Sequence, residues 1–194
     1  MIIYLVGIGC VGKTTIGSML AKTIGFTFFD LDKEIENFYQ TSIERIQDAC
    51  LGMHEFRRKG SIVLDQLFSK NIDSVISGTP SGLKFSYLGV YKKHKKDKTL
   101  YSIHLHDSFE NVLNRLTFYD KDSNPIIEQI DELKRKRYLN AIKADYNYFA
   151  SSYERADFQM NIEHIKLEDI PYFIIEELRQ QNIMPLTTLH HSQA

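Results

Sequence analysis

A glycine-rich segment that ends in lysine and threonine is the part of this sequence that predicts chemistry most directly. Residues 7–14, GIGCVGKT, match the pattern GxxxxGK[ST] at every fixed position. An apolar, β-branched run at residues 2–6 precedes the segment, and a helical pattern begins directly after it. Glycines allow successive backbone N–H groups to turn towards phosphate oxygens, and the N-terminus of the following helix adds its positive dipole end. The segment therefore predicts a loop that binds the phosphates of a nucleotide.

The residues of this loop have separate expected roles. Lys13 is expected to place its charge on the β and γ phosphates of ATP and to act in catalysis, and the Thr14 hydroxyl is expected to bind Mg²⁺. A cysteine at a helix N-terminus can become redox sensitive, but we interpret Cys10 as a spacer that contributes its backbone. The remaining expected nucleotide-binding residues are Gly7, Gly9, Val11, Gly12 and Thr15.

Two carboxylates follow the second predicted strand. Asp30 and Asp32 stand at the C-terminal end of that strand, which is where open α/β sheets place their ligands. There Asp30 can reach the metal through water, and Asp32 can accept a hydroxyl proton from a substrate. The alternative is that one of the two only caps the next helix, which is a common role for aspartate.

Length, charge and cysteine content exclude several other classes of protein. A chain of 194 residues with 43% apolar and 25% charged positions fits one α/β domain. A formal net charge of -1 gives no general attraction to nucleic acid, and Cys10 and Cys50 are too few for a secreted disulfide framework. The apolar start is far shorter than the roughly 20 residues that span a bilayer. We therefore expect a reduced, cytoplasmic protein, monomeric and independent of membranes, that binds a small-molecule acceptor.

The hydrophobic pattern predicts strands that alternate with helices. Such alternation indicates a parallel sheet covered by helices on both faces, an α/β fold of three layers. We expect five strands, at residues 2–6, 26–29, 74–76, 99–105 and 158–162. We expect helices at residues 14–23, 30–39, 42–50, 53–68, 108–118 with Asp107 as N-cap, from 127 past 143, and 167–180.

Three polar segments are expected to lie outside these elements. Residues 120–125 form a charged loop that ends at a proline, and the lysine-rich cluster at residues 92–96 is interpreted as a solvated loop. Residues 1–183 are expected to form one domain, followed by a frayed tail at 184–194. His190 and His191 in that tail could bind metal, but without a third ligand nearby we interpret them as solvated.

Taken together, these motifs resemble the shikimate kinase family. After the phosphate loop that family has a strand ending in DxD, then an IE pair, then GExxFR at the start of a long helix. This chain has, in the same order, Asp30, Leu31, Asp32, Ile35, Glu36, Gly52, Met53, Phe56 and Arg57. The resemblance covers about residues 1–160 and implies a P-loop kinase fold with a mobile lid at about residues 119–127.

The resemblance also implies an activity and a set of roles. The expected reaction transfers the γ-phosphoryl group of ATP, with Mg²⁺, to a hydroxyl of shikimate or a related small carboxylated polyol, a step of aromatic amino acid biosynthesis. Asp32 would orient or deprotonate that hydroxyl, Asp30 would serve the metal, and Arg57 would clamp the acceptor carboxylate. Gly78 would lie in the turn that contacts the acceptor, and Arg115 would lie against the nucleotide.

Several positions depart from the family pattern. Met53 and Gly60 replace two glutamates, and the turn at residues 77–82 replaces a run of three glycines. Asn124 stands where the family has its lid arginine, and a further substrate arginine should fall at Tyr148 or Phe149. The cations that could replace them, in or just beyond the lid, are Lys121, Arg135 and Arg137.

Two other functions are compatible with these departures. Another P-loop kinase, of the nucleoside monophosphate or gluconate kinase type, is one of them, because Gly78, Thr79 and Pro80 echo a Gly-x-Pro turn of the former. The other is a degenerate kinase domain that binds nucleotide as a sensor. The missing arginines favour a sensor, whereas the presence of Lys13, Thr14, Asp30 and Asp32 favours an enzyme.

Overall fold

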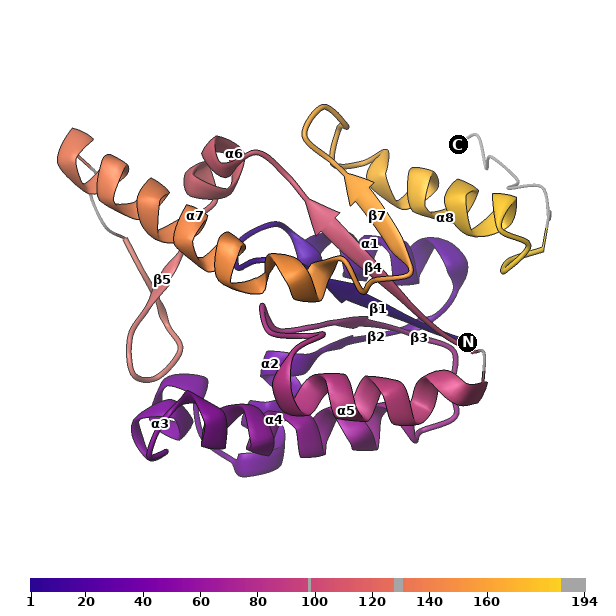
Figure 1. Cartoon of the computed structure of the whole chain (residues 1–194), viewed down its shortest axis with the longest axis horizontal. Helices are drawn as coiled ribbons and strands as arrows, with labels where there is room; N and C mark the ends of the chain where they lie inside the picture. Colours follow the sequence, from indigo (N-terminus) through magenta and orange to yellow (C-terminus); the bar gives the residue numbers. More distant parts are fainter. Residues whose placement is uncertain (98, 128–130, 186–194) are drawn as a thin grey trace.

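Five parallel strands form one sheet at the centre of the computed structural model, which describes residues 1–97, 99–127 and 131–185 (Figure 1). The strand order is β2-β3-β1-β4-β7. Every residue of the middle strand is buried, which explains its uninterrupted apolar sequence. The strands are β1 (Ile2–Val6), β2 (Thr27–Asp30), β3 (Ser74–Ser77), β4 (Leu100–His106) and β7 (Phe158–Asn161). The predicted five-stranded parallel sheet is confirmed. Most of the observed strand ends differ from the predicted ones, each by a single residue.

Helices cover both faces of this sheet. In Figure 1, α4 and α5 lie side by side below the sheet, and α8 lies on its other side, where it contacts α1. The helices are α1 (Lys13–Ile24), α2 (Leu31–Tyr39), α3 (Ile43–Asp48), α4 (Met53–Phe68), α5 (Phe85–His94), α6 (Phe109–Asn114), α7 (Glu132–Tyr153) and α8 (Ile170–Gln180). This arrangement confirms the expected three-layer α/β fold.

Helix α5 was not expected from the sequence. It begins without a side-chain cap, its first residue Phe85 has a positive φ of 54°, and only Tyr87 and Tyr91 of the helix are buried. Neither a cap nor a long apolar stripe therefore marks its start. The prediction that residues 92–96 form a solvated loop was wrong, because they form the last turn of α5 and a short 3-10 helix, Lys95–Asp97.

The region of the expected lid contains a small hairpin. Strands β5 (Phe118–Tyr119) and β6 (Pro125–Ile126) pair antiparallel. The turn between them is held by Asp120, whose carboxylate accepts hydrogen bonds from the backbone of Asp122 and Asn124. The predicted charged loop at residues 120–125 is therefore the turn of this hairpin, except that Pro125 belongs to β6.

The helices on either side of the hairpin also differ from the prediction. The expected helix at residues 108–118 ends at Asn114 because strand β5 follows it, and its N-cap is Ser108 rather than Asp107. The side chain of Asp107 instead accepts hydrogen bonds from Ser108 and Asn111 and pairs with Arg115. The long helix expected from residue 127 begins at Glu132, while residues 128–130 lie outside the described part of the chain.

The end of the chain is described only in part. Ile183 and Met184 are partly buried against the core. The expected tail therefore begins in contact with the domain, and His190 and His191 lie outside the described residues. Across the described ranges, no helix combines the length and the apolar composition that crossing a membrane requires.

Helices α4 and α5 pack closely at a glycine. A Cβ atom on Gly60 of α4 would overlap the hydroxyl oxygen of Tyr87 on α5 and would lie 3.0 Å from the Ile35 side chain. Tyr87 is fully buried, and its hydroxyl makes no hydrogen bond of good geometry among the described residues, although Thr79 lies nearby. The absence of a side chain at Gly60 is therefore what admits the tyrosine ring.

We expect Gly60→Ala to lower the free energy of unfolding by about 1–3 kcal/mol, because the added methyl group overpacks a buried contact. Gly89→Ala is the matched control, since Gly89 also lies in a helix but has open space around its Cβ position. It should stabilise the protein by roughly 0.5–1 kcal/mol through helix propensity. Urea unfolding of both variants tests the packing, and equal gains for the two would contradict it.

Candidate active site

The phosphate loop joins the end of β1 to the start of α1. Gly7 has a φ of 147°, and a Cβ atom there would lie 2.6 Å from the carbonyl oxygen of Leu105. Gly12, at the N-terminus of α1, has a φ of 106°. Both positions favour glycine, because side chains rarely adopt this backbone conformation. The predicted loop thus has the local geometry that the motif requires.

Lys13 points back into this loop. Its ammonium donates hydrogen bonds to the carbonyl oxygens of Gly7 at 3.0 Å and Ile8 at 2.8 Å, and the residue is buried. Burial lowers the pKa of Lys13 to about 8, against the opposing effect of Asp32 and other neighbours. The side chain is therefore mostly charged at neutral pH and is held at the centre of the loop.

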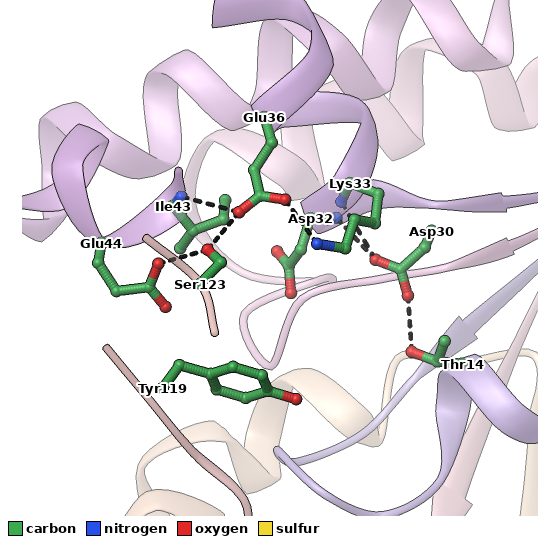
Figure 2. Close-up of a pocket in the computed structure, with 9 residues that line it drawn as sticks. All are labelled: Thr14, Asp30, Asp32, Lys33, Glu36, Ile43, Glu44, Tyr119 and Ser123. Carbon is green, nitrogen blue, oxygen red and sulfur yellow. Dashed lines mark hydrogen bonds and ion pairs between the residues drawn. The ribbon is translucent and has the colours of Figure 1, made fainter. Parts of the chain in front are cut away.

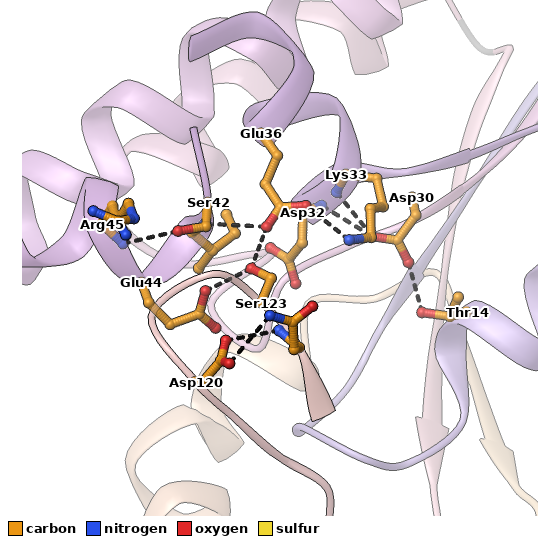
Figure 3. A network of polar contacts seen from close by, with 12 residues as sticks. Thr14, Asp30, Asp32, Lys33, Glu36, Ser42, Glu44, Arg45, Asp120 and Ser123 are labelled. Atoms are coloured by element: carbon orange, nitrogen blue, oxygen red, sulfur yellow. Dashed lines mark hydrogen bonds and ion pairs between the residues drawn. The ribbon is translucent and has the colours of Figure 1, made fainter. Parts of the chain in front are cut away.

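Asp30 connects the starts of two helices. One of its carboxylate oxygens accepts a hydrogen bond from the Thr14 hydroxyl at 2.6 Å, and the other accepts from the backbone N–H groups of Asp32 and Lys33 (Figure 3). Of the two aspartates, Asp30 is therefore the one that caps α2. Capping and metal binding are compatible, since the oxygen that faces Thr14 is not the capping oxygen.

The group around Thr14 fits a magnesium ion. The Thr14 hydroxyl lies 3.4 Å from the Ser77 hydroxyl as well as 2.6 Å from the Asp30 carboxylate. Mg²⁺ prefers oxygen ligands of this kind and is commonly held by one or two carboxylates together with substrate phosphates. Ser77 was not singled out from the sequence. The feature that could have identified it is that Ser77 is a polar residue at the carboxyl end of β3.

Asp32 lies between two cavities. A cavity of about 490 Å³ is lined by the phosphate loop with Asp32, Gly78 and Arg115, and a second of about 300 Å³ lies beneath the lid. Thr14, Asp32 and Tyr119 line both. The first therefore offers room for a nucleotide and the second for an acceptor, with the Asp32 carboxylate at their junction.

The second cavity is rich in carboxylates (Figure 2). Figure 2 shows the Asp32 carboxylate pointing into the space between α2 and the ring of Tyr119. The other lining residues are Thr14, Asp30, Lys33, Glu36, Ile43, Glu44 and Ser123. Enclosure by the cavity walls, with the nearby charge of Asp30, raises the pKa of Asp32 to about 6, while Lys13 opposes the shift. Asp32 is thus ionised at neutral pH but can hold a proton under mildly acidic conditions.

The hairpin of the lid is held against α2 and α3 by polar contacts (Figure 3). The Ser123 hydroxyl lies 2.5 Å from a Glu36 oxygen and 2.6 Å from a Glu44 oxygen, and Arg45 pairs with Asp122 at 2.7 Å. A hydroxyl carries one proton, so Ser123 can donate to only one of these carboxylates at a time. Glu36 was noted in the sequence as part of the Ile-Glu pair of the family pattern. Nothing in the sequence linked Glu36 to Ser123.

Gly78 and Arg57, the remaining residues predicted to bind the acceptor, make contacts that the sequence did not predict, and Arg57 is not among the described residues that line the two cavities. The N–H of Gly78 donates to the Leu5 carbonyl at 2.9 Å, so Gly78 lines the cavity as a wall and not as a free donor. The guanidinium of Arg57 stacks 4.4 Å from the centre of the Phe85 ring.

Arg115, predicted to lie against the nucleotide, and two of the expected replacement cations, Lys121 and Arg135, point in different directions. Arg115 lines the nucleotide cavity and pairs with Asp107. The ammonium of Lys121 lies 3.9 Å from Asp48 on α3, and Arg135 pairs with Glu110 on α6. To meet a transferring phosphate, Lys121 would therefore have to leave the α3 side.

The raised pKa of Asp32 predicts how stability depends on pH. Between its ordinary value of 3.8 and about 6, the folded state binds more protons at this site than the unfolded state, so this contribution to stability falls as pH rises. Asp32→Asn should therefore gain stability at pH 8 and lose that gain near pH 4. Because the carboxylate also faces water, we expect a gain of no more than about 1 kcal/mol. Glu34→Gln, on the same helix, controls for the helix dipole, and unfolding curves from pH 4 to 8 supply the measurement.

Comparison with known proteins agrees with this geometry. A family model described as shikimate kinase matches residues 9–170. A shikimate kinase from Aquifex aeolicus (strain VF5) is 28% identical over 178 residues, which cover 92% of this chain and 94% of that protein. Shikimate kinase 3, chloroplastic, from Oryza sativa subsp. japonica is 28% identical over 172 residues, 86% of this chain and 56% of the relative.

A solved structure supports the fold. The shikimate kinase from Acinetobacter baumannii in complex with shikimate superposes with a TM-score of 0.73 at 22% identity, over 94% of this chain and 95% of that one. The match to the family model extends over most of the chain and includes the residues from Gly9 to Ile170. The chain therefore belongs to the shikimate kinase family.

Proposed function

We propose that this protein transfers the γ-phosphoryl group of ATP to a hydroxyl of shikimate or a closely related small carboxylated polyol. The observation that carries the proposal is the position of Asp32 at the junction of the phosphate-loop cavity and the cavity beneath the lid. Family membership supports ATP as the phosphoryl donor. The near-neutral net charge supports a small-molecule acceptor in place of a polyanion, and we expect the protein to act as a cytoplasmic monomer.

On the donor side, the chain supplies positive charge and backbone donors. Lys13 would exchange its two loop carbonyls for oxygens of the β and γ phosphates, and the N-terminus of α1 would face the same anion. Thr14 and Asp30 would hold Mg²⁺, which supplies charge neutralisation on the phosphates when bound. Among the described residues, Lys13 and Arg115 are the cationic side chains that line this cavity. Arg115 is therefore our candidate for the charge that the missing lid arginine would supply.

On the acceptor side, Asp32 would accept a hydrogen bond from the attacking hydroxyl and take its proton late in the reaction. Phosphoryl transfer passes through a loose transition state, so orientation of the nucleophile matters more than early proton removal. The pKa of about 6 keeps Asp32 ionised at neutral pH, as this role requires. Tyr119 and Ser123, both on the lid hairpin, would cover the acceptor and limit the entry of water.

The central test is an ADP-release assay with shikimate, quinate, gluconate and nucleoside monophosphates as acceptors. We expect turnover with shikimate, and we expect Asp32→Asn to lower it by roughly two orders of magnitude, the lower end of the range for a lost general base. ATP affinity should stay the same, since Asp32 acts on the acceptor. Turnover that is unchanged in Asp32→Asn would leave the residue without a catalytic role. No ADP release with any acceptor would favour a nucleotide sensor.

ATP binding itself gives a second prediction. ATP with Mg²⁺ at a hundredfold excess over its dissociation constant should stabilise the wild type by roughly 2.7 kcal/mol. Lys13→Ala should abolish most of this effect, because both its charge and its position in the loop are lost. A thermal-shift titration measures the difference, with Lys22→Ala, an exposed lysine on the same helix, as control. Equal stabilisation of wild type and Lys13→Ala would contradict the assignment.

A further inference from the structure

Three side chains border the passage between the two cavities of the active site. Thr14, Asp32 and Tyr119 line both the nucleotide cavity and the cavity beneath the lid. A phosphoryl group that moves from a nucleotide in the first cavity to an acceptor in the second must pass these side chains. Figure 2 shows the Tyr119 ring across the cavity from Asp32, with its hydroxyl turned to the side of Thr14. The roles of Thr14 and Asp32 in the proposed function leave this hydroxyl unassigned.

At the passage itself, the Tyr119 hydroxyl is the donor that other groups of the protein do not use. The Thr14 hydroxyl donates its proton to Asp30 at 2.6 Å. Asp32, with a pKa of about 6, is ionised at neutral pH and can only accept. Tyr119 is exposed, and its hydroxyl makes no hydrogen bond to any residue that the structure describes. Its proton is therefore available to a ligand.

The other donors beneath the lid are also in use. The ammonium of Lys33 donates to a Glu36 oxygen at 2.8 Å. The Ser123 hydroxyl has one proton and two carboxylate neighbours, Glu36 and Glu44. Of the side chains that line this cavity within the described ranges, Tyr119 thus has the one hydroxyl or amine that is free to donate.

Strand β5 directs Tyr119 into the cavity. Successive side chains of a strand point to opposite faces. The Phe118 ring packs on Tyr138 of α7, with 5.1 Å between the ring centres, so Tyr119 faces the other way. On the far side of Tyr119, the hairpin turn is held to α3 by the ion pair of Asp122 with Arg45 at 2.7 Å. The strand that carries Tyr119 is therefore anchored at both of its ends.

The polar lid residues considered in the sequence analysis do not supply a donor to this passage. The side-chain amide of Asn124, where the family has its arginine, donates to Asp120 at 3.1 Å within the hairpin. The ammonium of Lys121 lies 3.9 Å from Asp48 on α3. Neither residue lines the cavity that Tyr119 shares with the nucleotide. Tyr119 is therefore the lid residue placed to meet a group in transit.

A donor is needed here because the cavity beneath the lid is acidic. Its lining contains four carboxylates, those of Asp30, Asp32, Glu36 and Glu44. They would repel the anionic oxygens of a phosphoryl group as it approaches the acceptor. Lys13 and Arg115 line the nucleotide cavity and not the one beneath the lid. A hydrogen bond from the lid would offset part of this repulsion where the two cations act least.

We propose that the Tyr119 hydroxyl donates a hydrogen bond to the phosphoryl group during its transfer and is a catalytic residue of this enzyme. The inference rests on the proposed function for the reaction. In that reaction the acceptor oxygen forms a bond to the γ-phosphorus, while the bond from this phosphorus to the β–γ bridging oxygen breaks. The electron pair of the broken bond leaves with ADP, and the acceptor proton passes to Asp32. Tyr119 keeps its proton and stabilises the charge on the equatorial oxygens.

The test compares wild type with Tyr119→Phe, which keeps the ring and removes only the hydroxyl. We expect the single-turnover rate with shikimate to fall about tenfold or more, as the loss of one hydrogen bond to a charged group predicts. The KM values for ATP and shikimate should change less than about threefold, because the contact forms in the transition state. Tyr172→Phe, which changes an exposed tyrosine on α8, is the matched control and should behave as wild type.

A second variant separates this role from that of a cover. Tyr119→Ala removes both ring and hydroxyl, so it should lose at least as much rate as Tyr119→Phe and should also raise the KM for shikimate. If Tyr119→Phe is as fast as wild type and only Tyr119→Ala is slow, the ring acts as a cover alone and the inference is overturned. Equal urea-unfolding midpoints for the variants exclude loss of fold as the cause.

Binding of a transition-state mimic separates the inference from the proposed function. Aluminium fluoride with ADP and Mg²⁺ imitates the transferring phosphoryl group and needs no turnover. We expect it to tighten ADP binding to wild type, and we expect Tyr119→Phe to lose about tenfold of that tightening, while ADP alone binds both equally. Tightening in a wild type that does not turn over shikimate would contradict the proposed function and leave the role of Tyr119 supported. No tightening in wild type, or equal tightening in both, would overturn the inference.

Discussion

The carboxylate of Asp30 is the contact on which the geometry of this site depends. Asp30 is the last residue of β2. Its carboxylate caps α2 by accepting hydrogen bonds from two backbone N–H groups, and it accepts a further hydrogen bond from the Thr14 hydroxyl at the start of α1. A single side chain thereby fixes the phosphate loop relative to the helix that carries Asp32. The parallel sheet makes this possible, because the carboxyl ends of its strands all meet at one edge. Thr14, Asp30 and Asp32 are therefore positioned by rigid elements, and the hairpin adds Tyr119 and Ser123 to the lining of the same cavity.

The site holds two charged side chains, Lys13 and Asp32, in surroundings that favour their neutral forms. Burial disfavours the charged form of Lys13, and enclosure disfavours the charged form of Asp32. Their mutual attraction offsets part of this cost, and the phosphates of ATP would offset more on the lysine side. A site of this kind is less stable when empty than when occupied, which is a common relation between stability and function in enzymes.

The departures from the family pattern are connected through packing. Gly60, which replaces a glutamate, leaves the space that the Tyr87 hydroxyl fills, and this brings α5 close to α4. The start of α5 carries Phe85, whose ring stacks on Arg57, and Lys84, whose stem reaches α7. Changes that look independent in the sequence thus occur around one set of contacts among α4, α5 and α7.

The sequence by itself determined the phosphate loop, the sheet and the positions of Asp30 and Asp32, because these depend on local patterns. Glycine spacing, a buried apolar strand and a helix start are all contained within residues 2–24. Helix α5 was missed because neither a cap nor a long apolar stripe marks it. The cap of α6 was assigned to Asp107, one residue too early, since adjacent Asp and Ser both suit that position.

Only the tertiary structure decided which distant side chains meet. Ser123 reaches Glu36 and Glu44 across 87 and 79 residues of sequence, and Lys84 reaches Tyr148 across 64. Nothing in the local sequence specifies such contacts, because they depend on how the lid and α7 pack on the rest of the domain. For the same reason, the motif singled out Arg57 but could not predict that its guanidinium stacks on the Phe85 ring.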